Sequence, residues 1–325
     1  RIVETKERAR DVLFAHLVGC TLLGIYGLGT GRFVRDRLDG VGGPGMDDAN
    51  TLGMYFATGV IVAAGMVITQ RDWRRWVSFA ALAIVGNGLV LTNTRGAVLG
   101  LVAGAFVLFL TKSRLYSRAF WLLCVACVFG AMLVVDQKFV ERMSTLSEAW
   151  SDSSEIDDSA LSRLALLDAQ FKMFQDYRLG TGHRGTEALS TKYLDKQWLS
   201  QDDQGVEGTR SSHNTFMTAL VEQGVPGAVL FVWLALWTVV TLLRSGAKEA
   251  LHGDPELTTL IATIGGALAV IFVAGNTADF LMAEVQFWLF AVLVSTLQFA
   301  RTRRAQQADA EARPSPTGGA QQRAG

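Results

Sequence analysis

A histidine stands at the end of a long polar stretch, directly before an apolar segment. It is His213, in the run Ser-Ser-His-Asn-Thr at residues 211–215. An imidazole titrates near neutral pH, so this side chain suits proton transfer from a hydroxyl or another nucleophile. The alternative is a structural histidine that caps the loop or hydrogen-bonds within it.

A carboxylate follows nine residues later, inside the apolar segment. Ionisable groups are costly near a membrane, so Glu222 is a functional candidate by default. The alternative is a plain ion pair with a basic neighbour.

An arginine lies in a tight connection between two apolar segments, in the run Thr-Asn-Thr-Arg-Gly-Ala at residues 92–97. The guanidinium of this Arg95 has the geometry to bind phosphate or carboxylate. Alternatively it snorkels to lipid phosphates without a role in chemistry. Arg37 and Arg163 are further cations, and their value depends on whether they converge with Arg95.

Other common site chemistries have little support. The neighbouring carboxylate pairs have no histidine partner in sequence: Asp47 with Asp48, Asp157 with Asp158, and Asp202 with Asp203. The glycine-rich run at residues 180–185 follows no strand pattern, so it is not a nucleotide-binding fingerprint. We therefore expect no metal site and no cofactor.

Composition indicates the class of protein that positions these residues. Hydrophobic residues make up 50% of the chain and charged residues 18%, with a mean hydropathy of +0.27. The chain is thus too apolar for a soluble protein of this length, and its polar residues must gather in loops. We predict an all-α integral membrane protein. A formal net charge of zero gives no sign of a nucleic-acid partner, and none is expected.

Apolar segments of roughly 17 to 25 residues can cross the membrane as helices. About eight segments qualify: 12–30, 51–69, 76–93, 96–112, 119–136, 215–243, 257–276 and 284–300. The sixth is too long for one straight helix, and Gly224, Pro226 and Gly227 predict a kink or an interfacial first turn near its start. Gly100 and Gly104 suit close helix packing.

Basic residues in the short loops predict the orientation, because they resist translocation. They gather in alternate connections: Arg1 to Arg10; Arg71, Arg74 and Arg75; Lys112, Arg114 and Arg118; Arg244 and Lys248; Arg301, Arg303 and Arg304. That side is expected to be cytoplasmic. The candidate site residues fall on the other side.

The chain therefore divides into four parts: helices with short loops at 1–136, a long outer loop at 137–214, further helices at 215–300 and a disordered cytoplasmic tail at 301–325. Apolar residues recur at nearly helical spacing inside the long loop: Leu161, Leu164, Ala165, Ala169, Phe171 and Met173. They predict an amphipathic helix from about 160 to 176, capped by Asp157, Asp158 or Ser159. Its apolar face would lie on the membrane surface or over the helices.

Three stretches carry a resemblance to a known family. The first is Gly-Met-Asp-Asp-Ala-Asn-Thr-Leu-Gly at residues 45–53, and the second is Thr-Arg-Gly-Ala at residues 94–97. The third, which is the most specific, combines residues 163–182, 212–216 and 222–227. Together they resemble the O-antigen ligase and polymerase superfamily of bacterial envelope membrane proteins. The departures are Thr94 where serine is commoner and Arg178 where a proline often stands. The chain begins on Arg1 and lacks the family's first helices, so we expect an N-terminally truncated sequence.

The resemblance implies a metal-independent, inverting glycosyltransferase in the bacterial inner membrane, with its active face periplasmic. The donor would be a glycan on undecaprenyl pyrophosphate, and the acceptor a sugar hydroxyl of lipid A core or of a growing glycan. Arg95, Arg163 and Arg37 would bind the pyrophosphate, while His213 would deprotonate or orient the acceptor. Glu222 and Asn214, in the same motifs, would support them.

Alternatives stay open. An O-antigen or exopolysaccharide polymerase, or a protein oligosaccharyltransferase, would carry the same motifs as a ligase. A solute transporter is an alternative of another class, although charges within the spans are sparse for a coupled carrier. The last alternative is a purely structural assembly partner. For the enzyme, membrane lipid is a further expected partner.

Overall fold

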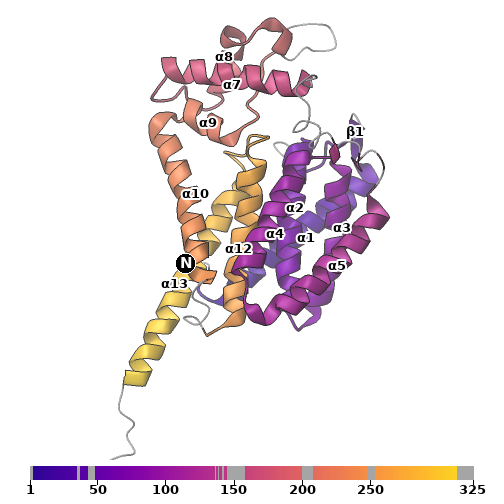
Figure 1. Cartoon of the computed structure of the whole chain (residues 1–325), viewed down its shortest axis with the longest axis vertical. Coiled ribbons are helices and arrows are strands. Elements are labelled where there is room, and N and C mark those ends of the chain that lie inside the picture. The colour runs from indigo at the N-terminus through magenta and orange to yellow at the C-terminus, as the bar shows by residue number, and fades with distance from the viewer. Residues whose placement is uncertain are drawn as a thin grey trace, which may run out of the picture.

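The computed structural model describes residues 3–34, 37–42, 48–135, 137, 139–140, 143–144, 158–199, 208–246 and 253–312. Within these ranges the protein is all-α apart from one short hairpin, as the composition predicts (Figure 1). The helices of the membrane part are α1 (Lys6–Thr30), α2 (Ala49–Thr69), α3 (Trp73–Leu91), α4 (Arg95–Thr111), α5 (Ser117–Val134), α9 (Thr215–Glu222), α10 (Gly224–Gly246), α12 (Pro255–Ala274) and α13 (Glu284–Ala312). The antiparallel hairpin pairs β1 (Arg32–Val34) with β2 (Arg37–Asp39), and the short helix η1 (Arg114–Tyr116) precedes α5.

Six helices in the described ranges are long and apolar enough to cross a membrane. They are Lys6–Thr30, Ala49–Thr69, Trp73–Leu91, Arg114–Val134, Gly224–Arg244 and Pro255–Ala274. The predicted class of protein is therefore confirmed, but the count of eight is not. Helix α4 has 17 residues, which is short against the roughly 20 that span hydrocarbon. Helix α13 is apolar only in its first part.

The sixth predicted span is divided where its glycines stand. Helix α9 ends at Glu222 and α10 begins at Gly224, whose φ of +67° is a left-handed conformation that favours glycine. The predicted break is confirmed. It leaves α9 at the outer end of the molecule and sends α10 down along the other helices (Figure 1).

Helices α4 and α12 pack with their backbones in close approach. A Cβ at Gly104 would lie 2.6 Å from the carbonyl oxygen of Gly266, and one at Gly100 would lie 2.8 Å from that of Val270. Small residues allow such an approach, which replaces the hydrophobic driving force that is missing between helices in lipid. Helices α2 and α12 are mostly buried, whereas α5 and α10 expose most of their apolar surface. Helices α2 and α12 therefore form the centre of the membrane part.

Ion pairs hold several helix ends together on one side. Lys6 at the start of α1 contacts Asp254 at 3.3 Å and Glu256 at 2.8 Å, both at the start of α12. Arg303 of α13 reaches the same Asp254 at 2.8 Å. The predicted basic side therefore exists as one end of the molecule, and its cytoplasmic placement stays a prediction.

The opposite end carries a small helical unit, which we call the outer cap and define as residues 158–199 and 208–214. It contains α7 (Asp158–Asp176), α8 (Gly185–Tyr193) and the short helix η2 (Lys196–Trp198). In Figure 1, α7 lies across the top of the molecule above α9. Leu166 and Ala169 of α7 are buried against Leu194 and Leu199 in the cap's own apolar core. The predicted amphipathic helix is confirmed, and it packs on protein.

Some predicted features lie outside the described residues. These are residues 45–47 of the first motif, the candidate cap Asp157 and the tail from 313 onward. The first part of the predicted disordered tail, residues 301–312, instead continues α13. Its Ala, Gln, Arg and Glu residues are good helix formers, so the helix does not stop where the apolar segment ends.

Candidate active site

His213 lies at the end of the outer cap, just before α9, where the cap meets the membrane helices. It is partly buried, and the charges of Arg210, Arg163 and Asp48 act on it. Burial first, and then the two arginines, lower the pKa of His213, while Asp48 opposes them. The imidazole is therefore neutral at pH 7, and one ring nitrogen can accept a proton.

Arg163 belongs to the face of α7 that looks toward His213. Seven residues on, at the same angular position of the helix, the fully buried Gln170 donates a hydrogen bond of 2.9 Å to the hydroxyl of Ser212. Ser212 directly precedes His213. The sequence-predicted pair Arg163 and His213 is thus brought together, one residue from each side of the cap.

Asn214 and Thr215 fix the position of His213. The Asn214 side chain caps α9 by accepting from the N–H groups of Phe216 at 2.9 Å and Met217 at 3.1 Å. The Thr215 hydroxyl donates to the carbonyl of Ala278 at 3.0 Å and accepts from Phe280 N–H at 2.8 Å, in the turn between α12 and α13. The histidine therefore stands on a rigid helix start.

Arg37 holds the hairpin against the turn between α3 and α4. Its guanidinium donates to the carbonyl of Thr92 at 3.1 Å, to the hydroxyl of Thr94 at 3.0 Å and to the side chain of Asn50 at 2.8 Å. These bonds position the turn that leads into Arg95. The binding of pyrophosphate by Arg37 stays a prediction.

Arg95 is the first residue of α4, at the same end of the molecule as His213. A Cβ at the adjacent Gly96 would lie 1.8 Å from the hydroxyl of Thr277, so α4 begins directly against the turn between α12 and α13. In that same turn, the carbonyl of Gly275 accepts the N–H of Thr215 at 2.7 Å. Arg95 and His213 therefore flank one turn.

Glu222 stabilises the cap. Its carboxylate accepts from the N–H groups of Arg184 at 2.9 Å and Thr186 at 3.4 Å, at the start of α8, a helix that has no capping side chain of its own. A carboxylate at a helix N-terminus also interacts favourably with the helix dipole. Two backbone donors thus bind the carboxylate where the alternative reading had a basic neighbour.

Two glycine turns interlock beside Glu222. The N–H of Gly182 donates to the carbonyl of Glu222 at 3.0 Å, and the N–H of Val225 donates to that of Arg178 at 3.0 Å. Gly180 and Gly224 both have positive φ, and a Cβ on either would meet the other turn within 2.6 Å. Residues 163–182 and 222–227, which stand apart in the sequence, therefore form one junction.

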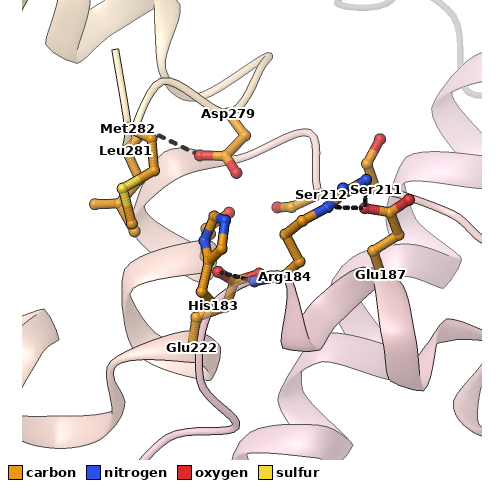
Figure 2. A pocket seen from close by; sticks show the side chains of 10 residues that line it. His183, Arg184, Glu187, Ser211, Ser212, Glu222, Asp279, Leu281 and Met282 are labelled. Carbon is orange, nitrogen blue, oxygen red and sulfur yellow. Dashed lines mark hydrogen bonds and ion pairs between the residues drawn. The ribbon is translucent and has the colours of Figure 1, made fainter. Parts of the chain in front are cut away.

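A cavity of about 140 Å³ opens beside this junction (Figure 2). Its ionisable side chains are His183, Arg184 and Glu187 of the cap, Glu222 of α9 and Asp279 of the turn between α12 and α13, and Ser212 lines it too. Arg184 is paired with Glu187 at 2.6 Å. Partial loss of water raises the pKa of Asp279, as does the nearby Glu222, while Leu281 N–H and Thr218 act in the opposite direction. In the described part of the chain, no three His, Cys, Asp or Glu side chains gather as metal ligands would. Metal independence stays a prediction.

Comparison with known proteins points to one family. A family model described as O-antigen ligase matches residues 80–232. Over these residues, which are just under half of the chain, the protein is similar to the O-antigen ligase family. No curated protein matches it.

The O-antigen ligase match includes Arg95, Arg163, His213, Asn214 and Glu222 and leaves out Arg37. The match supports an enzyme of the O-antigen ligase type, and the apolar helices support a multi-pass membrane protein. The described parts of the three family motifs, which for the first motif are residues 48–53, lie at the outer ends of α2, α4 and α9 and are joined there by direct contacts and through the turn between α12 and α13.

Sequence reasoning missed Arg210 and undervalued His183. Arg210 lies three residues before His213 and acts on its charge, and its Nε is buried with no hydrogen-bond partner in the described ranges. Its closeness in sequence to His213 was the available signal. His183 belongs to the glycine-rich run at residues 180–185, and its only signal in the sequence is that it directly follows the motif that ends at Gly182.

Proposed function

We propose that this protein transfers a glycan from undecaprenyl pyrophosphate to a sugar hydroxyl at the periplasmic face of the inner membrane. The observation that supports this most is the environment of His213, a partly buried imidazole with a lowered pKa and arginines beside it. A base and a set of cations are the two requirements of such a transfer.

The reaction needs one proton acceptor and one stabiliser of a leaving group. His213 takes the proton of the acceptor hydroxyl as its oxygen forms a bond to the anomeric carbon of the donor sugar. The bond from that carbon to the pyrophosphate breaks, and undecaprenyl pyrophosphate leaves with the electron pair. Arg163 and Arg95 neutralise the charge that develops on the leaving oxygen by charge-assisted hydrogen bonds.

The acceptor separates the two finer versions of this function. A ligase uses lipid A core, and we favour it because the matching family model carries that description. A polymerase uses a growing glycan with the same residues.

A glycan profile of cells tests the proposal. A deletion strain that carries His213→Ala should insert the protein normally but lose ligated glycan and accumulate the lipid-linked donor, because removal of a general base slows transfer by roughly 10² to 10⁴-fold. Asp176→Asn, on an exposed cap residue, is the control. A wild-type profile with His213→Ala contradicts the proposal, and a profile of single repeat units on lipid A core favours the polymerase.

A further inference from the structure

The cavity beside His213 has a different chemistry from the arginine side of the same residue. Ser212 lines the cavity, and His213 follows it in the chain. Its ionisable side chains are the carboxylates of Glu222 and Asp279, the imidazole of His183, and the ion pair of Arg184 with Glu187 (Figure 2). Because Glu187 offsets the charge of Arg184 at 2.6 Å, Glu222 and Asp279 leave the cavity acidic. His213 itself has Arg163 and Arg210 close enough for their charges to act on it.

This separation of charge favours different positions for the donor's pyrophosphate and for the acceptor's sugar. A pyrophosphate is drawn to the arginines and repelled by carboxylates at close range. Sugar hydroxyls, in contrast, are donors that carboxylate oxygens accept well. The cavity therefore favours an uncharged sugar over any phosphate.

The two carboxylates are held in place and keep capacity to accept further bonds. Each oxygen of Glu222 accepts one backbone N–H, from Arg184 or Thr186, and an ionised carboxylate offers about four acceptor positions. Asp279 accepts from the N–H of Leu281 at 3.0 Å. Leu281 and Met282 add apolar surface for the C–H face of a ring. At about 140 Å³, against the roughly 300 Å³ where pockets for drug-sized ligands begin, the cavity suits one ring.

We infer that this cavity binds the uncharged sugar ring of the acceptor that carries the attacking hydroxyl, with Asp279, Glu222 and His183 as its recognition groups. The inference rests on the proposed function. In an inverting displacement the nucleophile approaches opposite the leaving group, so the acceptor belongs on the side of His213 away from the arginines. His213, between the two, then faces the hydroxyl that it deprotonates.

Kinetics in proteoliposomes test the inference. The donor is a glycan on undecaprenyl pyrophosphate, and the acceptor is lipid A core from cells that lack O-antigen. Asp279→Asn should raise the KM for the acceptor about tenfold, the effect of one hydrogen bond to a charged group, with kcat and the donor KM within a few-fold of wild type. Asp168→Asn, on the exposed face of α7, is the matched control and should change neither constant.

A binding measurement separates this inference from the proposed function. Delipidated core oligosaccharide should bind to the His213→Ala protein in saturation-transfer NMR, and the binding should be lost when Asp279→Asn is added. A wild-type protein that transfers no glycan overturns the proposed function, while this binding arm still decides whether the cavity takes a sugar.

Three results overturn the inference: an unchanged acceptor KM with Asp279→Asn, a raised donor KM, which would place the donor sugar in the cavity, and oligosaccharide binding that does not depend on Asp279. If Asp279→Asn does not fold, His183→Gln is judged by the same constants.

Discussion

At the scale of single residues, the electrostatic environment of His213 decides what the site can do. Burial and the charges of Arg210 and Arg163 all disfavour its protonated form. A base with a lowered pKa stays neutral, and so available, at a lower pH than a free histidine would. Arginines near His213 therefore attract a pyrophosphate and also keep the imidazole in its neutral form.

Arg210→Gln should raise the pKa of His213. Of the two arginine charges that lower this pKa, the substitution removes the one with the larger effect. A raised pKa means that His213 is protonated at a higher pH, so the acidic limb of the pH profile of kcat/KM moves to higher pH. The measurement is transfer rate against pH in proteoliposomes. Arg178→Gln, on an exposed arginine of the junction, should leave the limb in place. A limb that stays put or moves to lower pH with Arg210→Gln contradicts this account of His213.

At the scale of elements, close contacts between backbones position the site. Helices α4 and α12 meet at Gly100, Gly104 and Gly266, and this contact sets where α4 begins and hence where Arg95 stands. The junction of the glycine turns at 178–182 and 221–225 does the same for the cap. Both contacts leave no room for a Cβ.

Gly104→Ala should destabilise the protein by about 1 to 3 kcal/mol, because the added methyl group overlaps the carbonyl of Gly266. Gly130→Ala in α5 is the control, since its Cβ would meet nothing within 4 Å, and the better helix propensity of alanine should make it neutral or stabilising. Thermal unfolding in detergent measures both. Equal midpoints for the two variants would show that α4 and α12 do not approach closely.

Gly224→Ala should destabilise the cap more than Gly182→Ala does. Both glycines have positive φ, so both variants carry the left-handed penalty of about 1 to 2 kcal/mol. Only a Cβ at Gly224 also meets backbone, 2.3 Å from the carbonyl carbon of Leu179. Proteolysis of the cap in membranes measures the difference. Similar cleavage rates would argue against the interlocked turns.

The sequence predicts these elements unevenly, for physical reasons. The break at Gly224 and the helix 158–176 follow from glycine, proline and apolar spacing, which act locally. The face of α7 that packs on protein cannot be predicted in this way. Ala169 and Met173 are buried, but Leu164 and Phe171, which share the predicted spacing, are exposed. Two apolar stripes overlap on that helix, and only the partners at 194 and 199 select one of them.

The site shows the same limit. His213 and Arg163 are visible as unusual residues in motifs, whereas the partners of Glu222 come from a turn about forty residues earlier. Arg210 stands in a polar run without a periodic apolar pattern, so no pattern in the sequence predicts its contacts. Such contacts between distant segments depend on the tertiary structure.

At the scale of the whole molecule, charge and hydropathy set the orientation. One end gathers the ion pairs of Lys6, Asp254 and Arg303, and the other carries the cap and the candidate site. The charge rule places the first end in the cytoplasm. On that prediction the site faces the periplasm.

Cysteine labelling should show the two ends on opposite sides of the membrane. In a background without Cys20, Cys124 and Cys127, a membrane-impermeant thiol reagent added to the periplasmic side should label Leu179→Cys in the cap, which is 86% exposed. Arg75→Cys, in the first turn of α3 at the opposite end, should react only after the membrane is opened. The reverse pattern would invert the topology and place the site away from periplasmic donors.

The most direct test of the central claim is the rate of glycan transfer by the purified protein in proteoliposomes, from undecaprenyl pyrophosphate to lipid A core, compared between wild type and His213→Ala. We predict that His213→Ala lowers kcat by at least about a hundredfold, the usual effect of removing a general base, and leaves the donor KM within a few-fold of wild type. A His213→Ala protein that is folded and transfers glycan at the wild-type rate would contradict the account.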